Sequence, residues 1–461
     1  MRPIVTPDEM RAIDASAVVP VDVLIERAGA AVARAAVRML GGTYGRTVDV
    51  IVGPGNNGAD GRVVARLLAA AGVRVRVHEA ATCPPRLGPT DLVVDAAYGT
   101  GVRGAWQPPD VGTARVLAVD IPSGVDGRTG AAEGPVLAAE RTVTFAAWKP
   151  GLLFAPGRDL AGEVEVADIG LAVGGAAAHV LERGDAIDWW PTRGSAAHKW
   201  HAALRVVAGS RTMPGAAALV AAGALRTGAG MVHVSSPGLD GHGQLPVEAV
   251  QRPLPAVGWA DEALRSFDRF HAAVIGPGLG RADEMAASAR HTIVHAPLPL
   301  VVDGDALFAL AWNADGASTL LRRRSAPTVL TPHDGEYQLL TGARPVADRI
   351  VAARRLAFDT GCIVLLKGPT TVVAEPGGQA LVVTAGDERL ATAGSGDVLA
   401  GIIGSLLARQ VPAFEAAALG AWAHGTAACR SHREGFIASD LPGALPGLLA
   451  ELAGNGGGDE R

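Results

Sequence analysis

The amino-acid sequence predicts an α/β protein with more than one domain. Short apolar runs typical of buried strands alternate with helical segments, and glycine-rich loops separate them along the chain. The length of 461 residues favours two or three domains, and an apolar fraction of 49% is enough for large cores. A total of 60 glycines indicates many loops in which the backbone approaches another group closely.

The first half of the chain has the order of a parallel sheet. A helix is expected over residues 28–40, because this stretch is rich in Ala and Val and ends at Gly41-Gly42. Apolar strands joined through helices form parallel sheets that are covered on both faces. The order therefore predicts a Rossmann-like three-layer domain over residues 1–172. Its other expected elements are strands 48–52, 73–77, 92–94 and 116–119 and a helix over 60–71.

A second domain follows a segment without strand alternation. Residues 173–194 mix glycines, charged residues and Trp189-Trp190-Pro191, and we interpret them as a linker. The strand pattern then resumes and predicts an α/β domain over residues 195–453, followed by a flexible tail over 454–461. Its expected elements are strands 204–208, 231–235, 273–275, 300–302, 328–330, 363–366 and 371–374 and helices 397–408 and 414–429.

The charge balance and the apolar pattern exclude several classes of function. With 41 basic and 46 acidic residues and no basic block, the chain favours neither nucleic acid nor an anionic membrane as a partner. Residues 1–11 lack the apolar segment of a signal peptide, and no apolar run reaches the ~18 residues of a membrane span. The three cysteines are far apart and form no CxxC pair. We expect a cytoplasmic homo-oligomer that acts on small molecules.

Two residue types are scarce, and their few positions are informative. Only three of the 41 basic residues are lysine, namely Lys149, Lys199 and Lys367, and only four residues of the chain are asparagine. Arginine does not replace lysine at a tight phosphate or proton-transfer site, because the guanidinium is planar and the ammonium compact. The three lysines, together with the adjacent Asn56 and Asn57, lie in motifs that carry candidate sites.

A glycine-rich loop connects the strand expected over residues 48–52 to the helix expected over residues 60–71. Residues 53–61 read Gly-Pro-Gly-Asn-Asn-Gly-Ala-Asp-Gly and satisfy GxGxxG, a pattern that lets the backbone approach a phosphate at a helix N-terminus. One interpretation is a dinucleotide-binding loop, with Glu79 as the ribose-binding acid. The alternative is that Asn56, Asn57 and Asp60 bind a cation or a polar ring.

Two aspartates repeat one arrangement. Asp95 follows Val93-Val94 and precedes Gly99-Thr100-Gly101, and Asp120 follows an apolar strand and precedes Ile121-Pro122-Ser123-Gly124. The carboxyl ends of parallel strands line the ligand crevice of such sheets. One such aspartate is as often a turn or a helix cap, but two of them, each followed by a glycine loop, predict a ligand site.

The segment 391–401 reads Ala-Thr-Ala-Gly-Ser-Gly-Asp-Val-Leu-Ala-Gly and opens a predicted helix. One interpretation is a Ser/Asp helix cap. The other is phosphoryl transfer, in which Asp397 accepts a hydroxyl proton while the N–H groups of the turn hold the transferring anion. Small residues flank Asp397 and leave room for a large ligand, which favours the second interpretation.

The first 171 residues resemble the NAD(P)H-hydrate epimerase family. The shared motifs are Thr-Pro-Asp-Glu-Met-Arg at 6–11, Glu-Arg-Ala-Gly at 26–29, the Asn-Asn-Gly-Ala-Asp-Gly loop, Asp-Ile-Pro-Ser-Gly at 120–124 and Trp-Lys-Pro-Gly at 148–151. The resemblance implies that Asn57, Asp95 and Ser123 bind a potassium ion. It further implies that the hydrated nucleotide contacts Asn56, Asn57, Gly58, Ala59, Asp60, Gly99, Thr100, Gly101, Val102, Arg103, Gly104, Ala105 and Asp120. Ala59 stands where this family usually has glycine.

Residues 195–452 resemble the NAD(P)H-hydrate dehydratase family, which has the ribokinase-like fold. Five spaced motifs agree: Val-Ile-Gly-Pro-Gly-Leu-Gly at 274–280, Val-Asp-Gly-Asp-Ala-Leu at 302–307, Leu-Thr-Pro-His-Asp-Gly-Glu at 330–336, Leu-Lys-Gly-Pro-Thr-Thr at 366–371 and the Gly-Ser-Gly-Asp turn. The residues implied to contact the hydrate are Ala216, Gly278, Gly280, His333 and Asp397. Those implied to contact the adenine nucleotide are Lys367, Gly368, Pro369, Thr370, Thr371 and Gly396. Trp200 stands where the family usually has glycine.

Together the two resemblances imply a repair enzyme for NADH and NADPH that have gained water across the nicotinamide C5–C6 bond. The second domain would phosphorylate the C6 hydroxyl from ADP or ATP, with Asp397 as base and magnesium on the nucleotide phosphates. Loss of phosphate would then restore the double bond. The first domain would interconvert the R and S epimers at C6, with Asp120 as acid or base and Lys149 as its helper.

Two other functions remain open from the residues alone. One is a ribokinase-like kinase of a small alcohol such as a vitamin, joined to a non-catalytic nucleotide-binding domain. The other is a nucleotide-sensing scaffold whose first domain has lost catalysis, which would be consistent with Ala59. The residues do not distinguish ADP from ATP as the donor.

Overall fold

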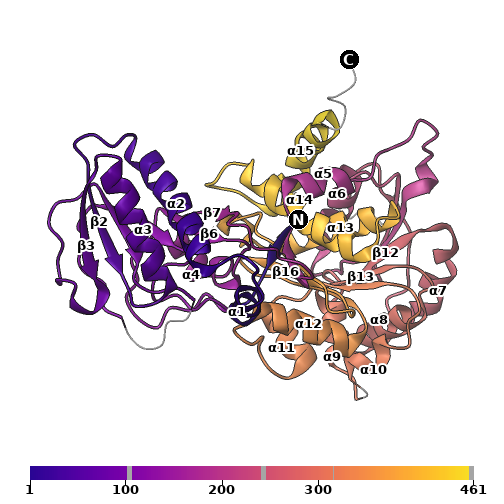
Figure 1. The fold of residues 1–461 in the computed structure, drawn as a ribbon. Helices are drawn as coiled ribbons and strands as arrows, with labels where there is room; N and C mark the ends of the chain where they lie inside the picture. The colour runs from indigo at the N-terminus through magenta and orange to yellow at the C-terminus, as the bar shows by residue number, and fades with distance from the viewer. Residues whose placement is uncertain (101–105, 240–244, 315, 456–461) are drawn as a thin grey trace. The chain divides into compact units, whose positions relative to one another are not determined.

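The structure is a computed structural model that describes residues 1–100, 106–239, 245–314 and 316–455. By its internal contacts the chain divides into two compact units, with the division between His179 and Val180 (Figure 1). Among the described residues, no helix has the length and apolar character needed to cross a membrane.

The first unit is built on a parallel sheet whose strands lie in the order β3-β2-β4-β5-β6-β7. The predicted strands are confirmed, but the prediction omits the last two. β6 and β7 alternate apolar residues with threonine or glutamate, and this pattern is weaker than a continuous apolar run. The strands are β2 (Thr47–Val52), β3 (Arg74–Glu79), β4 (Leu92–Ala96), β5 (Arg115–Val119), β6 (Arg141–Phe145) and β7 (Glu163–Ala167).

The helices α2 (Val21–Leu40) and α3 (Asn56–Ala70) pack on one face of this sheet through a shared apolar cluster. On the other face, loop residues such as Leu87 and Leu137 cover Val93 and Ala118. Both helices begin earlier than predicted. α3 begins at Asn56 rather than at residue 60, so the paired asparagines form its first turn. The short helices are α1 (Pro7–Ala15) and α4 (Gly157–Ala161).

The second unit is built on a larger mixed sheet, in which the strands follow the order β17-β16-β15-β14-β13-β12-β9-β10-β11. Pairing is parallel from β15 through β11, whereas β16 pairs antiparallel with both of its neighbours. The strands are β9 (Ala203–Val207), β10 (Met231–Ser235), β11 (Val250–Gln251), β12 (Ala272–Ile275), β13 (Leu300–Val302), β14 (Thr328–Leu330), β15 (Ile363–Leu366), β16 (Thr371–Ala374) and β17 (Ala380–Val383).

Helices cover both faces of this sheet (Figure 1). One layer holds α6 (Pro214–Arg226), α13 (Ser395–Ala408), α14 (Ala413–Cys429) and α15 (Leu441–Asn455), and its buried residues form one large apolar cluster. The other layer holds α7 (Ala260–Arg265), α8 (Asp283–His295), α9 (Asp305–Ala311), α10 (Ala317–Leu321), α11 (Asp334–Thr341) and α12 (Arg349–Thr360).

The segment that we interpret as a linker contains regular structure. β8 (Ala178–Val180) lies at the division between the units, and α5 (Arg183–Trp189) follows it. Leu181 and Ala186 belong to the large apolar cluster of the second unit, and Trp190 packs against it. The sequence pattern hides this contribution because the helix is short and carries charged residues on its exposed positions. The domain bounds themselves stay a prediction.

Candidate active sites

In the first unit, polar residues gather at the carboxyl ends of four adjacent strands. Asn57 lies in the first turn of α3 after β2, Asp95 lies in β4, Asp120 follows β5, and Lys149 follows β6. The carboxyl ends of neighbouring parallel strands share one edge of a sheet, which is where such folds bind ligands. The structure therefore brings these four predicted site residues to one edge.

Asp95 and Ser123 form a buried hydrogen-bonded pair. The Ser123 Oγ donates to Asp95 Oδ1 over 2.6 Å, and the Ser123 N–H donates to Asp95 Oδ2 over 2.9 Å. Burial raises the pKa of Asp95, and the bonds from Ser123 oppose that rise. The Tyr98 N–H donates to Ser123 Oγ over 2.8 Å, which fixes the start of the loop that leads to Gly99.

The amide group of Asn57 is buried and has no hydrogen-bond partner among the described residues. Within the described residues, neither its Oδ1 nor its Nδ2 makes a hydrogen bond. A Cβ atom placed on Gly99 would lie 3.6 Å from Asn57 Cγ and 3.6 Å from Asp120 Oδ2, so Asn57 and Asp120 border the same space. A buried amide without a partner costs about 1–3 kcal/mol, and a bound ligand or ion would supply the missing contacts.

Asp120 is held by a buried lysine and a buried threonine. Its Oδ1 lies 3.0 Å from Lys149 Nζ and accepts a 2.9 Å hydrogen bond from Thr144 Oγ1. Lys149 is 1% exposed, and its ammonium also donates to Thr144 Oγ1 and to the carbonyl oxygens of Phe145 and Ala147. The φ of Asp120 is 65°, a left-handed conformation that few non-glycine residues adopt. The backbone is therefore strained at the residue predicted to be catalytic.

Two further carboxyl groups approach this arrangement. Burial raises the pKa of Asp60 to about 8, and the charge of Asp120 adds to the rise. Burial also raises the pKa of Asp14 in α1, with an additional contribution from Asp120 that Lys149 opposes. At neutral pH, Asp60 therefore carries a proton that it can donate.

Three glycines of the 53–61 loop serve backbone packing. A Cβ on Gly53 would lie 1.7 Å from the carbonyl oxygen of Ala97, and one on Gly58 would lie 1.9 Å from the carbonyl oxygen of Gly53. Gly61 approaches the side chain of Ala96 in the same way. Close contact between strand and helix thus accounts for these positions without a bound phosphate.

Only some of the remaining predicted residues of this site lie among the described residues. Gly99 borders the space between Asn57 and Asp120. Thr100 lies against Gly127, because a Cβ placed on Gly127 would be 2.9 Å from Thr100 Cγ2. Asn56 and Ala59 lie in the first turn of α3. The predicted contacts of Gly101, Val102, Arg103, Gly104 and Ala105 lie outside the described residues.

Glu79 ends β3 and is exposed, and its role as a ribose-binding acid stays a prediction. Its carboxylate forms an exposed ion pair with Arg62, with Oε1 at 2.7 Å from the guanidinium. This pair links the end of β3 to α3.

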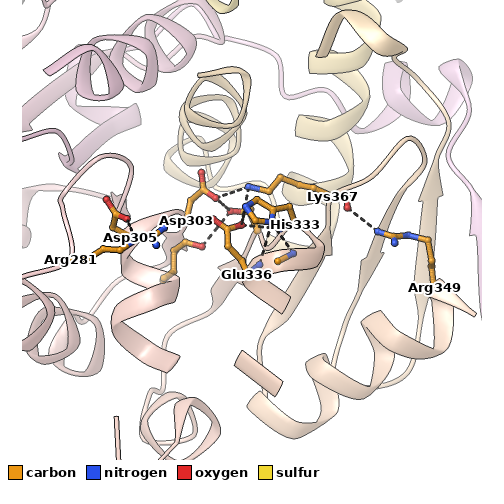
Figure 2. A network of polar contacts seen from close by, with 10 residues as sticks. Arg281, Asp303, Asp305, His333, Glu336, Arg349 and Lys367 are labelled. Carbon is orange, nitrogen blue, oxygen red and sulfur yellow. Dashed lines mark hydrogen bonds and ion pairs between the residues drawn. The ribbon is translucent and has the colours of Figure 1, made fainter. Parts of the chain in front are cut away.

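The second unit has its own polar cluster, again at the carboxyl edge of parallel strands. Asp303 follows β13, His333 follows β14, Lys367 follows β15, and Asp397 lies in the first turn of α13. Figure 2 shows Lys367, Asp303, His333 and Glu336 converging on one another. The motifs predicted to form the dehydratase site therefore meet in space.

Lys367 is the central cation of this cluster. Its Nζ lies 2.9 Å from Asp303 Oδ1 and 3.5 Å from Glu336 Oε2 (Figure 2). Burial opposes the charge of Lys367, but the carboxylates of Asp303 and Glu336 outweigh it and raise the pKa. Thr331 Oγ1 donates to the same oxygen of Asp303 over 2.8 Å. Asp303 and Glu336 have no individual role in the sequence prediction, although they lie inside its motifs.

Asp397 lies beside the Gly-Ser-Gly turn at the start of α13. Gly394 has a φ of 90°, a conformation that favours glycine, and it turns the chain into the helix. Burial raises the pKa of Asp397 to about 7, and Asp303 adds to the rise while Lys367 opposes it. A Cβ on Gly396 would lie 3.6 Å from Lys367 Nζ, so the turn and the lysine border one space. A carboxyl group that titrates near neutral pH is suited to general-base catalysis.

The histidine of this cluster caps a helix. His333 Nδ1 accepts hydrogen bonds from the N–H groups of Gly335 and Glu336 at the start of α11, and the Glu336 carboxylate accepts one from the His333 N–H. The ring is 59% exposed, and its Nε2 lies 3.6 Å from Glu336 Oε2. Helix capping thus accounts for the hydrogen bonds of the ring Nδ1. Contact between the ring and a hydrate stays a prediction.

Ala216 lies in α6, and Gly278 and Gly280 lie in the one loop between β12 and α8. A Cβ on Gly278 would lie 2.7 Å from the Cβ of Ala216 in α6, so these two positions are in contact. The Gly280 N–H donates to Asp305 Oδ2 over 2.8 Å, and Asp305 also pairs with Arg281 (Figure 2). Their contacts with a hydrate stay predictions.

An arginine at the start of α12 holds the loop between β15 and β16. Arg349 donates to the carbonyl oxygen of Lys367 over 2.8 Å, and its guanidinium also fills the space that a side chain at Gly368 would need. Thr370 is 2% exposed, and Thr371 begins β16. Nucleotide contacts of Gly368, Pro369, Thr370, Thr371 and Gly396 stay predictions.

Trp200 packs against other side chains at the amino ends of the strands. It lies in a short 3-10 helix that precedes β9, at the amino end of the strands, whereas the cluster around Lys367 lies at their carboxyl ends. Its ring contacts His233 and Phe270 edge to face, and the Arg269 guanidinium lies 4.0 Å above it. The adjacent Lys199 is exposed. Lys199 thus lies away from the cluster around Lys367, and whether the chemistry requires it stays a prediction.

Two family models match the chain. One, described as NAD(P)H-hydrate dehydratase, matches residues 204–445. The other, described as the N-terminus of YjeF-related proteins, matches residues 21–88 and 77–151.

Curated relatives match both units. The bifunctional NAD(P)H-hydrate repair enzyme of Mycobacterium tuberculosis is 38% identical over 454 residues, which cover 91% of this chain and 92% of the relative. Enzymes of the same name from Moorella thermoacetica and Escherichia coli are each 34% identical. The first covers 97% of both chains, and the second covers 87% of this chain and 84% of the relative.

Solved structures match the second unit. An ADP/ATP-dependent NAD(P)H-hydrate dehydratase from Bacillus subtilis, co-crystallized with ATP and Mg²⁺, gives a TM-score of 0.50 at 27% identity. The match covers 59% of this chain and 98% of that one. A ribokinase-like superfamily protein from Enterococcus faecalis gives a TM-score of 0.53 at 22% identity, covers 61% of this chain and 98% of that one, and supports the fold alone. The predicted α/β fold class is confirmed.

Proposed function

Because the chain belongs to the family of bifunctional NAD(P)H-hydrate repair enzymes, we propose that each of its two units carries one of the two activities of that family. The protein epimerises the hydrates of NADH and NADPH and dehydrates one epimer back to the reduced dinucleotide at the expense of a nucleotide. The Asp120 site is the epimerase site, and the Asp397 site is the dehydratase site.

In the dehydratase site, Asp397 accepts the proton of the C6 hydroxyl while that oxygen attacks the terminal phosphoryl group of ADP or ATP. The N–H groups of the Gly-Ser-Gly turn and the ammonium of Lys367 hold the charge that develops on the transferring phosphoryl oxygens. The C6–O bond of the phosphate ester then breaks, assisted by the lone pair of the ring nitrogen. Loss of a proton from C5 restores the double bond.

Magnesium is the expected companion of the donor nucleotide, and the relative crystallised with ATP and Mg²⁺ supports this proposal. The carboxylate oxygens of Asp303 and Glu336 lie beside Lys367 and are ligands of the kind that magnesium prefers. When bound, the ion would neutralise charge on the nucleotide phosphates.

In the epimerase site, Asp120 is the proposed acid or base at C6. The contacts from Lys149 and Thr144 hold its carboxylate in one orientation. Burial raises the pKa of Asp60 to about 8, and Asp60 serves as the complementary proton donor. The hydrated nicotinamide would occupy the space bordered by Asn57, Gly99 and Asp120.

We propose potassium as the ion of the epimerase site, with Asn57, Asp95 and Ser123 as its ligands. The unsatisfied Oδ1 of buried Asn57 supports a cation here. The oxygens of Asp95 and Ser123 already share hydrogen bonds, so they would contribute through their remaining lone pairs. The ion would fix the loops that carry Asn57 and Asp120.

The proposed setting is the cytoplasm, with a homo-oligomer acting on small molecules and binding neither nucleic acid nor membrane. A formal net charge of −5 without a basic block supports the choice of partners. Light scattering of the purified protein tests the assembly. The proposed domain bounds are 1–172 and 195–453, and limited proteolysis within residues 173–194 tests them.

The observation that carries the proposal is Asp397 beside the Gly-Ser-Gly turn and the half-buried Lys367. The test supplies hydrated NADH with ADP or with ATP and follows the near-ultraviolet absorbance of the reduced dinucleotide. Chromatographic separation of the epimers measures epimerisation in the same sample, with Asp120→Asn as the variant. Phosphorylation of a thiazole or pyridoxal alcohol without recovery of NADH would show a vitamin kinase instead. An unchanged epimerisation rate in Asp120→Asn would remove Asp120 from its role.

A further inference from the structure

A buried histidine of α14 contacts the phosphate-binding turn of the dehydratase site. The Nε2 of His424 lies 2.9 Å from the carbonyl oxygen of Ser395, and because a carbonyl only accepts, the ring donates this hydrogen bond. His424 is 6% exposed. Burial lowers its pKa to about 4, with Lys367 adding to the effect, so the ring is neutral at physiological pH.

Ser395 is the residue through which the turn is fixed. Its Oγ donates to the carbonyl oxygen of Leu390 over 2.8 Å, and its carbonyl oxygen accepts the bond from His424. Ser395 follows Gly394, whose left-handed conformation allows large changes of direction, and precedes Gly396. A turn between two glycines has little stiffness of its own, so contacts to its middle residue determine its position.

The loop before this turn is also attached to α14. Arg389 donates to the carbonyl oxygens of Ala428 and Ser431 over 3.0 and 2.7 Å. A Cβ on Gly425 would lie 2.2 Å from the carbonyl oxygen of Ala385, so helix and loop are in direct contact there. α14 therefore contacts the segment that leads into α13, and His424 is the residue of α14 that contacts the turn itself.

We propose that His424 is a positioning residue for phosphoryl transfer. Its hydrogen bond to Ser395 sets the direction of the N–H groups in the turn and the distance between Asp397 and Lys367. The proposal rests on the proposed function of the turn as the phosphate site. A displacement of about 1 Å in a reacting group costs on the order of 10²-fold in rate. The effect of losing His424 should therefore appear in nucleotide affinity and in the rate of dehydration, and not in epimerisation.

The test compares His424→Leu with His424→Gln in the full-length protein. The amide N–H of glutamine can replace the Nε2–H of histidine, whereas leucine fills the space without a donor. We expect His424→Leu to weaken ADP or ATP binding at least tenfold by calorimetry without hydrate and to lower kcat for dehydration. His424→Gln should recover most of both. His291→Leu, which removes an exposed histidine of α8, is the matched control and should leave both unchanged.

Several outcomes would overturn the proposal. Wild-type nucleotide affinity and kcat in a folded His424→Leu protein would do so, and so would an equal loss in both variants. If His424→Leu fails to fold, the folded His424→Gln protein decides by whether it keeps nucleotide affinity. Because the calorimetric measurement contains no hydrate, it is independent of the role of Asp397. Full dehydration by Asp397→Asn would contradict the proposed base and leave the affinity result on His424 intact.

Discussion

At the scale of single residues, both sites place a lysine ammonium against a carboxylate, and in each pair one of the two side chains is buried. Lys149 contacts Asp120 in the first unit, and Lys367 contacts Asp303 in the second. Removing one member of a buried pair typically costs about 3–5 kcal/mol, because the other charge is left without a partner. These contacts explain why lysine stands at two of its three positions in a chain that uses arginine for the other 38 basic residues.

Thr144→Val should lower the rate of epimerisation by about tenfold or more. The Thr144 hydroxyl bridges Lys149 and Asp120, and valine has the same shape without the hydrogen bonds. Thr142→Val is the matched control. Thr142 lies in the same strand, is equally buried and loses one hydrogen bond to the Ala161 carbonyl, away from the site. Equal epimerisation by the two variants, with equal unfolding midpoints in urea, would show that Thr144 has only a structural role.

Lys367→Arg should reduce dehydration by about 10²-fold, because a planar guanidinium does not fit between Asp303, Glu336 and the turn. Lys199→Arg should leave dehydration unchanged, since Lys199 is exposed at the other edge of the sheet. Steady-state kinetics of both variants measure the difference. A fully active Lys367→Arg protein would show that the charge alone is needed.

Dehydration should increase as the pH rises through about 7. Burial and the charge of Asp303 raise the pKa of Asp397 to about 7, so below that pH the carboxyl group keeps its proton and accepts none from the hydroxyl. The profile of kcat/KM against pH for the hydrate measures this dependence. A flat profile across neutral pH would contradict the assignment of Asp397 as the base.

At the scale of secondary structure elements, the helix that follows β2 depends on glycines that have no room for a side chain. Gly53 and Gly58 contact backbone carbonyl groups. The GxGxxG pattern predicts this loop correctly as a connection from strand to helix. It leaves open whether a given glycine faces a ligand or the protein, because close approach of either one requires a residue without a side chain.

Gly53→Ala should destabilise the protein by about 3 kcal/mol or more and abolish epimerisation. Its Cβ would lie 1.7 Å from the Ala97 carbonyl oxygen, and backbone on both sides prevents an inexpensive shift. Gly55→Ala is the control from the same loop, because nothing lies within 4 Å of its Cβ and its φ is −93°. Urea denaturation of both variants measures the difference. A tolerated Gly53→Ala would show that the loop can move.

The strands and the carboxylates at their ends were predictable from sequence, and the contacts between elements were not. Asp95, Asp120 and Asp397 can be found because each follows or opens an element of clear apolar pattern. Thr144 and Asp14 escape prediction because a threonine inside a strand and an aspartate on a surface helix have no special pattern. Their relevance depends on which strands are neighbours, and this is a property of the folded sheet.

At the scale of the whole molecule, each unit has an apolar core of its own, and the described residues of each polar cluster come from elements of one unit. Asp397→Asn should therefore abolish dehydration while epimerisation keeps its rate. Parallel assays of both reactions on one preparation measure this, with Asp268→Asn, an exposed aspartate of the second unit, as the control. Loss of both activities in Asp397→Asn would mean that the units depend on each other.

The division between His179 and Val180 lies within a single polypeptide. Every translation product therefore contains one copy of each unit, and no change in gene expression can alter their ratio. The balance between the two reactions is set by amino-acid substitutions that change one turnover rate against the other. Selection on either activity consequently acts on a shared abundance, so a destabilising change in one unit lowers the cellular supply of both.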